Sequence, residues 1–173
     1  MKNWRVAKGF TLVELMVAMA AGAFLLAGVS LSYSAIKSGI QVSKELENAQ
    51  EVLRYSNTVL TRSTKQSFDL PVVSADGMTI TYTMPAGVIT CNGDVSSVAV
   101  VERYYLQNNN LMCAKDADTP ERLLTGVETL SFSINNNVVT VNIKPEGLPR
   151  QFNNAVEMNI AVSSVILSGV FGS

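Results

Sequence analysis

The feature that most restricts the fold of this chain is a long apolar run close to its N-terminus. The segment Phe10–Val29 has 20 residues and is apolar apart from Thr11, Glu14 and its glycines. As an α-helix it would be about 30 Å long, which matches the hydrocarbon core of a bilayer. Basic residues at positions 2, 5 and 8 precede the run, and the first eight positions contain no acid. This layout is typical of a targeting segment or a membrane anchor.

Three interpretations of this segment compete. A cleaved secretory signal peptide accounts for the basic start and for an A-x-A-like site at Ala18–Ala20, but the apolar run continues beyond that site. A single-span anchor with its basic end in the cytoplasm follows from the positive-inside rule, but it leaves Glu14 unexplained. An ionised carboxylate inside the bilayer costs about 3 kcal/mol on the insertion scale, so it is kept where it has a partner. The third interpretation supplies that partner.

The residues around Glu14 form a more specific motif. The stretch Lys8-Gly9-Phe10-Thr11-Leu12-Val13-Glu14-Leu15 resembles the N-terminal signature of type IV prepilins and type II secretion pseudopilins. The resemblance implies that a dedicated peptidase cleaves after Gly9 and that the new first residue, Phe10, is N-methylated. It also implies that Glu14 meets the amine of a neighbouring Phe10 and sets the register between subunits. The simpler and compatible interpretation of Glu14 is a helix-start acid favoured by the helix dipole.

Composition excludes several classes of function. The chain has no histidine, which removes the Ser-His-Asp and Cys-His catalytic sites and disfavours most zinc and haem sites. Net charge is −1, and −4 after removal of the three leader cations. Nucleic-acid binding is therefore not expected from bulk charge, although a DNA-uptake filament stays open. Asp116 and Asp118 lack the glycine-centred spacing of a calcium loop, and we expect a solvated loop there. We predict no enzyme, no cofactor and no metal.

Beyond the apolar run, the pattern predicts that the same helix continues. Apolar or small residues recur at alternating spacings of four and three, which is one face of an amphipathic helix. They are Val42, Leu46, Ala49, Leu53, Ser56, Leu60 and Ser63. No proline occurs before Pro71, so we predict one helix from about Phe10 to about Gln66. The stripe also fits a short coiled coil, but packing against the chain's own sheet is the preferred interpretation.

After Gln66 the hydrophobic period changes to two, which predicts β-strands. Strands are expected at 78–84, 98–106, 111–113, 130–134, 139–143 and 156–162. Asparagine triplets at 108–110 and 135–137 are expected to turn two hairpins. The predicted fold class is α+β. With the resemblance, this is the type IV pilin fold, a long N-terminal α-helix with a membrane-spanning first half, packed on an antiparallel β-sheet head.

These elements divide the chain into four predicted segments. Residues 1–9 are a cleaved prepilin leader, 10–30 a transmembrane or filament-core helix, 31–67 the amphipathic half of the helix, and 68–173 a globular β-rich periplasmic head. Apolar residues 165–171 at the end of the last segment are interpreted as the end of a strand, or as a contact for a neighbouring subunit.

The two cysteines belong to the predicted head. Disulfides persist in the periplasm, so we predict a Cys91–Cys113 bond. By the chain-entropy argument, a disulfide that closes a loop of about 20 residues stabilises the folded state by about 3 kcal/mol. Two free buried thiols are the alternative.

The head also resembles particular members of the family. A Tyr-rich strand at 103–106, the turn, Leu111–Cys113 and the segment 123–132 resemble the PilW-type minor pilins and the related J-type minor pseudopilins. This implies a minor pilin of a type IV pilus that joins the priming complex for filament assembly and lies at or near the tip. The filament would support adhesion, motility or DNA uptake.

The resemblance also implies partners and a location. The partners are other minor pilins, the major pilin, the inner-membrane assembly platform and the prepilin peptidase. The location is the bacterial inner membrane, single-pass with a periplasmic head, and then the filament on the cell surface. A minor pseudopilin of type II secretion and a membrane-anchored adhesin or ligand-binding module stay open. An exposed aromatic cluster at Tyr104 and Tyr105 would favour the adhesin, although strand alternation predicts that one of them faces the core.

Overall fold

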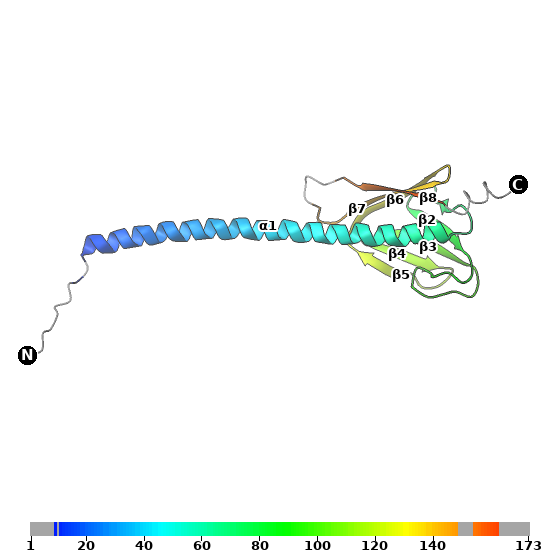
Figure 1. Cartoon of the computed structure of the whole chain (residues 1–173), viewed down its shortest axis with the longest axis horizontal. Coiled ribbons are helices and arrows are strands. Elements are labelled where there is room, and N and C mark those ends of the chain that lie inside the picture. The colour runs from blue at the N-terminus through cyan, green and yellow to red at the C-terminus, as the bar shows by residue number, and fades with distance from the viewer. Residues whose placement is uncertain (1–8, 10, 149–153, 163–173) are drawn as a thin grey trace, which may run out of the picture. The chain divides into compact units, whose positions relative to one another are not determined.

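The computed structural model describes residue 9 and residues 11–148 and 154–162 of the chain (Figure 1). The chain divides into two compact units, Met1–Ser43 and Lys44–Ser173. Helix α1 is Leu12–Gln66, close to the predicted limits, and its residues belong to the first unit up to Ser43 and to the second from Lys44. The segments 1–9, 10–30, 31–67 and 68–173 remain predictions, because the compact units follow packing and not processing.

In the second unit, one face of α1 is buried against the head. The buried residues of the helix are Ala49, Val52, Ser56, Val59, Leu60, Ser63 and Thr64. The predicted stripe is confirmed at Ala49 and the three later positions Ser56, Leu60 and Ser63, and Leu53 packs partly against the core. It is wrong at Val42 and Leu46, which are exposed. Burial of the helix begins only at Ala49, so the repeat extends further toward the N-terminus than the packing does.

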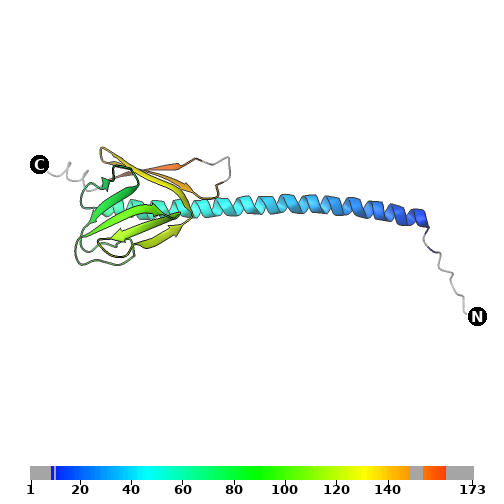
Figure 2. The same ribbon diagram turned by 180° about the vertical axis from the view of Figure 1, so that it is seen from behind.

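The head contains two antiparallel sheets in place of the single predicted sheet (Figure 2). The five-stranded sheet has the order β1-β2-β3-β4-β5 and the three-stranded sheet the order β6-β7-β8. The strands are β1 Val72–Val73, β2 Thr79–Met84, β3 Val100–Gln107, β4 Asn110–Lys115, β5 Glu121–Thr125, β6 Val127–Asn135, β7 Val138–Pro145 and β8 Val156–Ala161.

Both asparagine turns close hairpins as predicted. The β3–β4 turn places Asn108 and Asn109 at φ 49° and 60°, and the β6–β7 turn places Asn136 at φ 52°. Asparagine tolerates this left-handed region better than most residues. Strands β1 and β5 were not predicted, because β1 has only two residues and β5 is an edge strand without alternating burial.

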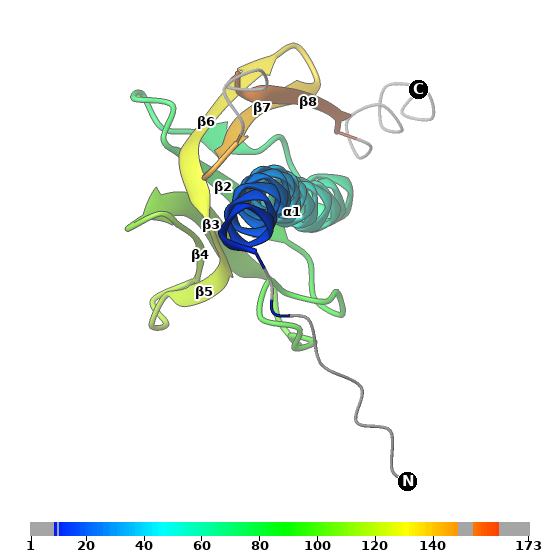
Figure 3. The same ribbon diagram turned by 90° about the vertical axis from the view of Figure 1, so that its left-hand side faces the viewer.

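The core lies between the C-terminal part of α1 and the two sheets, which curve around that part of the helix (Figure 3). It contains Leu60 from the helix, Tyr82 and Tyr104 from the larger sheet, and Val141 from the smaller sheet. Strand β6 also contacts the turn between β1 and β2, since the Phe132 N–H donates to the Gly77 carbonyl at 2.8 Å. The fold is thus α+β, a long N-terminal helix packed on antiparallel sheets.

Candidate functional site

The predicted cleavage site lies just before the helix. Gly9 is exposed, and among the described residues beyond its chain neighbours no atom lies within 4 Å of the place where a Cβ would be. An open backbone without a side chain suits entry into a protease site. Phe10 and the basic residues of the predicted leader lie outside the described residues.

Glu14 lies in the first turn of α1 and forms a capping box with Thr11. Its Oε2 atom accepts hydrogen bonds from the Thr11 N–H at 3.1 Å and from the Thr11 hydroxyl at 3.2 Å. The Glu14 N–H donates in return to Thr11 Oγ1 at 3.3 Å. This reciprocal pattern satisfies backbone groups that the start of a helix leaves unpaired. In the single chain, Glu14 therefore acts as a helix-start acid, which is the simpler of its two interpretations.

The N-terminal part of α1 is exposed and largely apolar. Every residue from Leu12 to Ser43 except Gly22 is exposed, including Phe24, Leu25 and Leu26 at 82%, 72% and 70%. The most apolar 18-residue window of the helix has a mean hydropathy of 2.2. The helix is thus long and apolar enough to cross a membrane, although a signal sequence near the N-terminus meets the same criterion.

A buried polar network lies at the other end of α1, where the helix meets the larger sheet. The carboxylate of Glu102 is fully buried. One of its oxygens accepts from the Cys91 N–H at 2.6 Å, and the other accepts from the Tyr104 hydroxyl at 2.9 Å and the Ser63 hydroxyl at 3.2 Å. Because Ser63 lies on α1, the Glu102 side chain joins the helix, strand β3 and the loop before β3.

The two buried tyrosines of this region are affected by the network. Burial raises the pKa of Tyr104 and of Tyr82 well above 10, and the negative charge of Glu102 adds to both shifts. The hydroxyl of Tyr104 lies 2.7 Å from that of Ser63, and the hydroxyl of Tyr82 lies 2.9 Å from that of Thr64. The rings meet edge to face with their centroids 5.8 Å apart.

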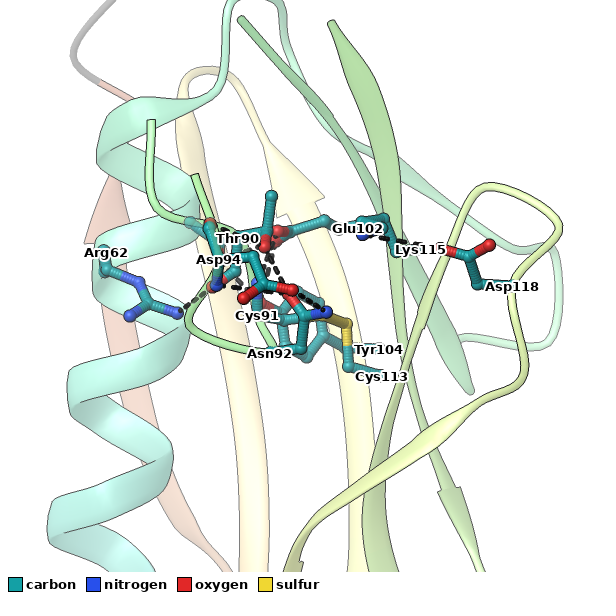
Figure 4. Close-up of a disulfide and its surroundings, with 11 residues drawn as sticks. Arg62, Thr90, Cys91, Asn92, Asp94, Glu102, Tyr104, Cys113, Lys115 and Asp118 are labelled. Carbon is teal, nitrogen blue, oxygen red and sulfur yellow. Dashed lines mark hydrogen bonds and ion pairs between the residues drawn. A yellow bond between two sulfur atoms is a disulfide. The ribbon is translucent and has the colours of Figure 1, made fainter. Parts of the chain in front are cut away.

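The loop between β2 and β3 is attached to its surroundings at three points. Cys91 and Cys113, the pair expected from the sequence, form a disulfide with a Cα–Cα distance of 6.4 Å. The Cys91 N–H is held by Glu102, and the Arg62 Nη2 on α1 donates to the Thr90 carbonyl at 3.2 Å (Figure 4). The sulfurs and one Glu102 oxygen lie within 4.8 Å of one another. Since cysteine binds metals as a free thiolate, these sulfurs serve as a crosslink here.

Sequence reasoning missed Glu102, although a signal for it was present. Strand β3 alternates between buried and exposed residues, and Glu102 lies between the buried Val100 and Tyr104 on the same face. An acid on the core face of a strand requires hydrogen-bond partners, since an unpaired buried charge is costly. The serine in the helical stripe, Ser63, is one of those partners.

The acidic pair Asp116 and Asp118 and the tyrosine pair Tyr104 and Tyr105 both lie among the described residues of the head. Asp116 accepts from the Val101 N–H at 2.8 Å, and Asp118 forms an ion pair with Lys115 at 3.4 Å. Tyr104 is fully buried and Tyr105 is half-buried on the opposite face of β3, as alternation predicts. The exposed aromatic cluster that would favour an adhesin is therefore not formed by this pair. The apolar segment 165–171 lies outside the described residues.

Comparison with known families identifies the N-terminal segment. Residues 4–30 match the prokaryotic N-terminal methylation motif. No curated protein matches the chain. The motif supports a type IV prepilin-like protein, a pilin or a pseudopilin, which is typically structural and not enzymatic. Together with the apolar half of α1, it is consistent with anchoring in the inner membrane and with pilus-assembly partners.

Proposed function

We propose that this chain is a minor pilin of a type IV pilus, processed between Gly9 and Phe10 and N-methylated on Phe10. The observation that carries the proposal is the methylation motif at residues 4–30, which runs directly into the exposed apolar half of α1. Before assembly this half spans the inner membrane, with the head in the periplasm. In the filament the same surface packs against neighbouring subunits, which removes it from lipid and water.

Glu14 has a second role in this scheme. The capping box holds its carboxylate within one helical turn of Thr11, the residue that directly follows the new N-terminus. A carboxylate at this place can meet the positive amine of a neighbouring Phe10. The pair neutralises two charges that are costly in apolar surroundings, and it sets the axial register between subunits.

The assignment to a minor pilin rests on the resemblance of the head to PilW-type subunits. Such a subunit joins other minor pilins on the assembly platform, primes the filament and stays at or near its tip. A minor pseudopilin uses the same N-terminal chemistry, and the head also resembles the J-type minor pseudopilins. The native context therefore distinguishes the two.

The test is deletion of the gene in the native bacterium, with pilus retraction both active and disabled. Surface pili are measured as major pilin sheared from the cells, and secreted proteins are measured in the same medium. Loss of sheared pilin with normal secretion supports the proposal, and complementation with the full chain should restore it. Normal pili with exoproteins retained in the periplasm would instead assign the chain to type II secretion. Normal pili and normal secretion would contradict both assignments.

A further inference from the structure

The outer face of the five-stranded sheet, turned away from α1, carries a pocket of about 350 Å³. It is lined by Thr79, Arg103, Tyr105, Ala114, Ala117, Asp118 and Pro120. Four of these residues are neighbours in the sheet, since Tyr105 pairs with Thr79 and Arg103 pairs with Ala114. The other three come from the connection between β4 and β5. The small side chain of Ala114 leaves the sheet side of the pocket open.

Arg103 supplies a positioned positive charge to this pocket. Its Nη2 atom donates to the backbone carbonyl of Asp116 at 2.8 Å, which links the guanidinium to the connection between β4 and β5. In the described part of the chain, Arg103 forms no ion pair. The nearby carboxylates have other partners, because Asp116 accepts from the Val101 N–H and Asp118 pairs with Lys115. The remaining N–H donors of Arg103 thus suit a planar carboxylate from a ligand.

The other residues that line the pocket indicate the chemistry of the rest of the ligand. Tyr105 is half-buried, and with Ala114, Ala117 and Pro120 it offers an apolar surface for a ring. The Thr79 hydroxyl and the Asp118 carboxylate offer hydrogen bonds to hydroxyl groups. One guanidinium and one carboxylate line the pocket, so its charge is balanced and disfavours a dianionic phosphate or a nucleic-acid backbone.

We propose that this pocket binds an acidic saccharide unit, a sugar ring that carries one carboxylate and several hydroxyl groups. The carboxylate pairs with Arg103, one face of the ring lies against Tyr105, and the hydroxyls bond to Thr79 and Asp118. The pocket would bind such a unit whether or not the chain enters a filament. Failure of binding and failure of the pilus assignment are therefore separate outcomes.

The test is calorimetric titration of the full chain in detergent micelles with D-galacturonate. Neutral D-galactose, which lacks the carboxylate, and acetate, which lacks the ring, are titrated in parallel. A ligand of this size reaches half-saturation at about millimolar concentration. We expect galacturonate to bind at least about tenfold more tightly than either comparison compound, the factor of one charge-assisted contact. Equal binding of acetate would reduce the site to a simple carboxylate site, and absence of galacturonate binding would overturn the proposal.

Three variants locate the binding. Arg103→Met should weaken galacturonate binding about tenfold or more. Arg122→Met is the matched control, because Arg122 is on β5 of the same sheet, paired with Met112 on β4, but does not line the pocket. Ala117→Phe fills the pocket from an exposed position and leaves Arg103 in place, so it tests the site even if Arg103→Met disturbs folding. Binding that survives both pocket variants, or that is lost equally with Arg122→Met, would contradict the assignment to this pocket.

Discussion

The carboxylate of Glu102 accepts a hydrogen bond from the backbone N–H of Cys91 at 2.6 Å. A fully buried acid on β3 thus holds the loop residue that carries one half of the disulfide. The same carboxylate bonds to Ser63 on α1, so one side chain connects the helix, the sheet and the crosslinked loop. Removing it leaves the Cys91 N–H and one of the two hydroxyls without an acceptor inside the head, since the Ser63 and Tyr104 hydroxyls lie 2.7 Å apart and one can donate to the other.

The first prediction concerns Glu102→Ala. We expect the free energy of unfolding of the head to fall by about 3 kcal/mol. The substitution removes the hydrogen bonds that a buried, charged carboxylate accepts. The measurement is urea unfolding of the full chain in detergent, followed by the near-ultraviolet circular dichroism of the buried tyrosines. Glu121→Ala, an exposed acid on β5, is the control and should change stability by less than about 0.5 kcal/mol. Equal effects of the two substitutions would contradict a structural role for the Glu102 network.

The second prediction concerns the disulfide. The Cys91→Ser, Cys113→Ser double variant should lose about 3 kcal/mol of stability, because the unfolded chain gains the freedom that the crosslink removes. Alkylation of the native chain with and without reductant should give masses that differ by two alkyl groups. Identical masses in the two samples would show that the cysteines are not crosslinked in the cell. Reduction should leave the stability of the double variant unchanged, which controls for other effects of the reductant.

The third prediction concerns alkaline pH. Burial raises the pKa of Tyr82 and Tyr104 in the folded head, so the unfolded chain loses these protons first as pH rises. The stability that they contribute is complete below the ordinary tyrosine pKa of about 10 and is lost progressively above it. Absorbance at 295 nm should show a late ionisation step that coincides with unfolding. The Tyr82→Phe, Tyr104→Phe double variant should lack that step, and its persistence would assign it to other tyrosines.

The fourth prediction separates the two roles of Glu14. Glu14→Gln keeps an acceptor for the capping box but removes the charge, whereas Thr11→Ala removes the cap and keeps the charge. If the carboxylate pairs with the Phe10 amine of a neighbour, Glu14→Gln should lose incorporation into sheared filaments and Thr11→Ala should retain it. Immunoblots of sheared filaments measure incorporation, and the mass of the N-terminal peptide checks processing after Gly9. Normal incorporation of Glu14→Gln would contradict the register role.

Much of the fold follows from short-range pattern. The apolar run, the stripe of four and three, and the absence of proline before Pro71 predict α1 almost to its ends. Alternation and asparagine turns predict the β3–β4 and β6–β7 hairpins, because both signals depend on neighbouring residues alone. The sequence pattern does not predict the two-residue strand β1 or the edge strand β5, since they depend on pairing partners that local pattern does not reveal.

The candidate sites also differ in whether their residues are neighbours in the sequence. The motif from Lys8 to Leu15 is contiguous, so it can be recognised from neighbouring residues. The Glu102 network and the pocket at Arg103 combine residues that are far apart in sequence. Ser63 and Glu102 are separated by 39 positions, and their contact depends on how α1 lies against β3.

The helix, the strand periodicity and the N-terminal motif can be predicted from the sequence, because helical and strand periods and a contiguous motif are properties of neighbouring residues. Three features become visible in the folded chain: the strands form two sheets, one face of the helix is buried from Ala49 onward, and Glu102 is buried beside the disulfide. The physical reason is that these features arise from contacts between distant segments. Whether a polar side chain is costly or stabilising depends on the partners that such contacts bring to it.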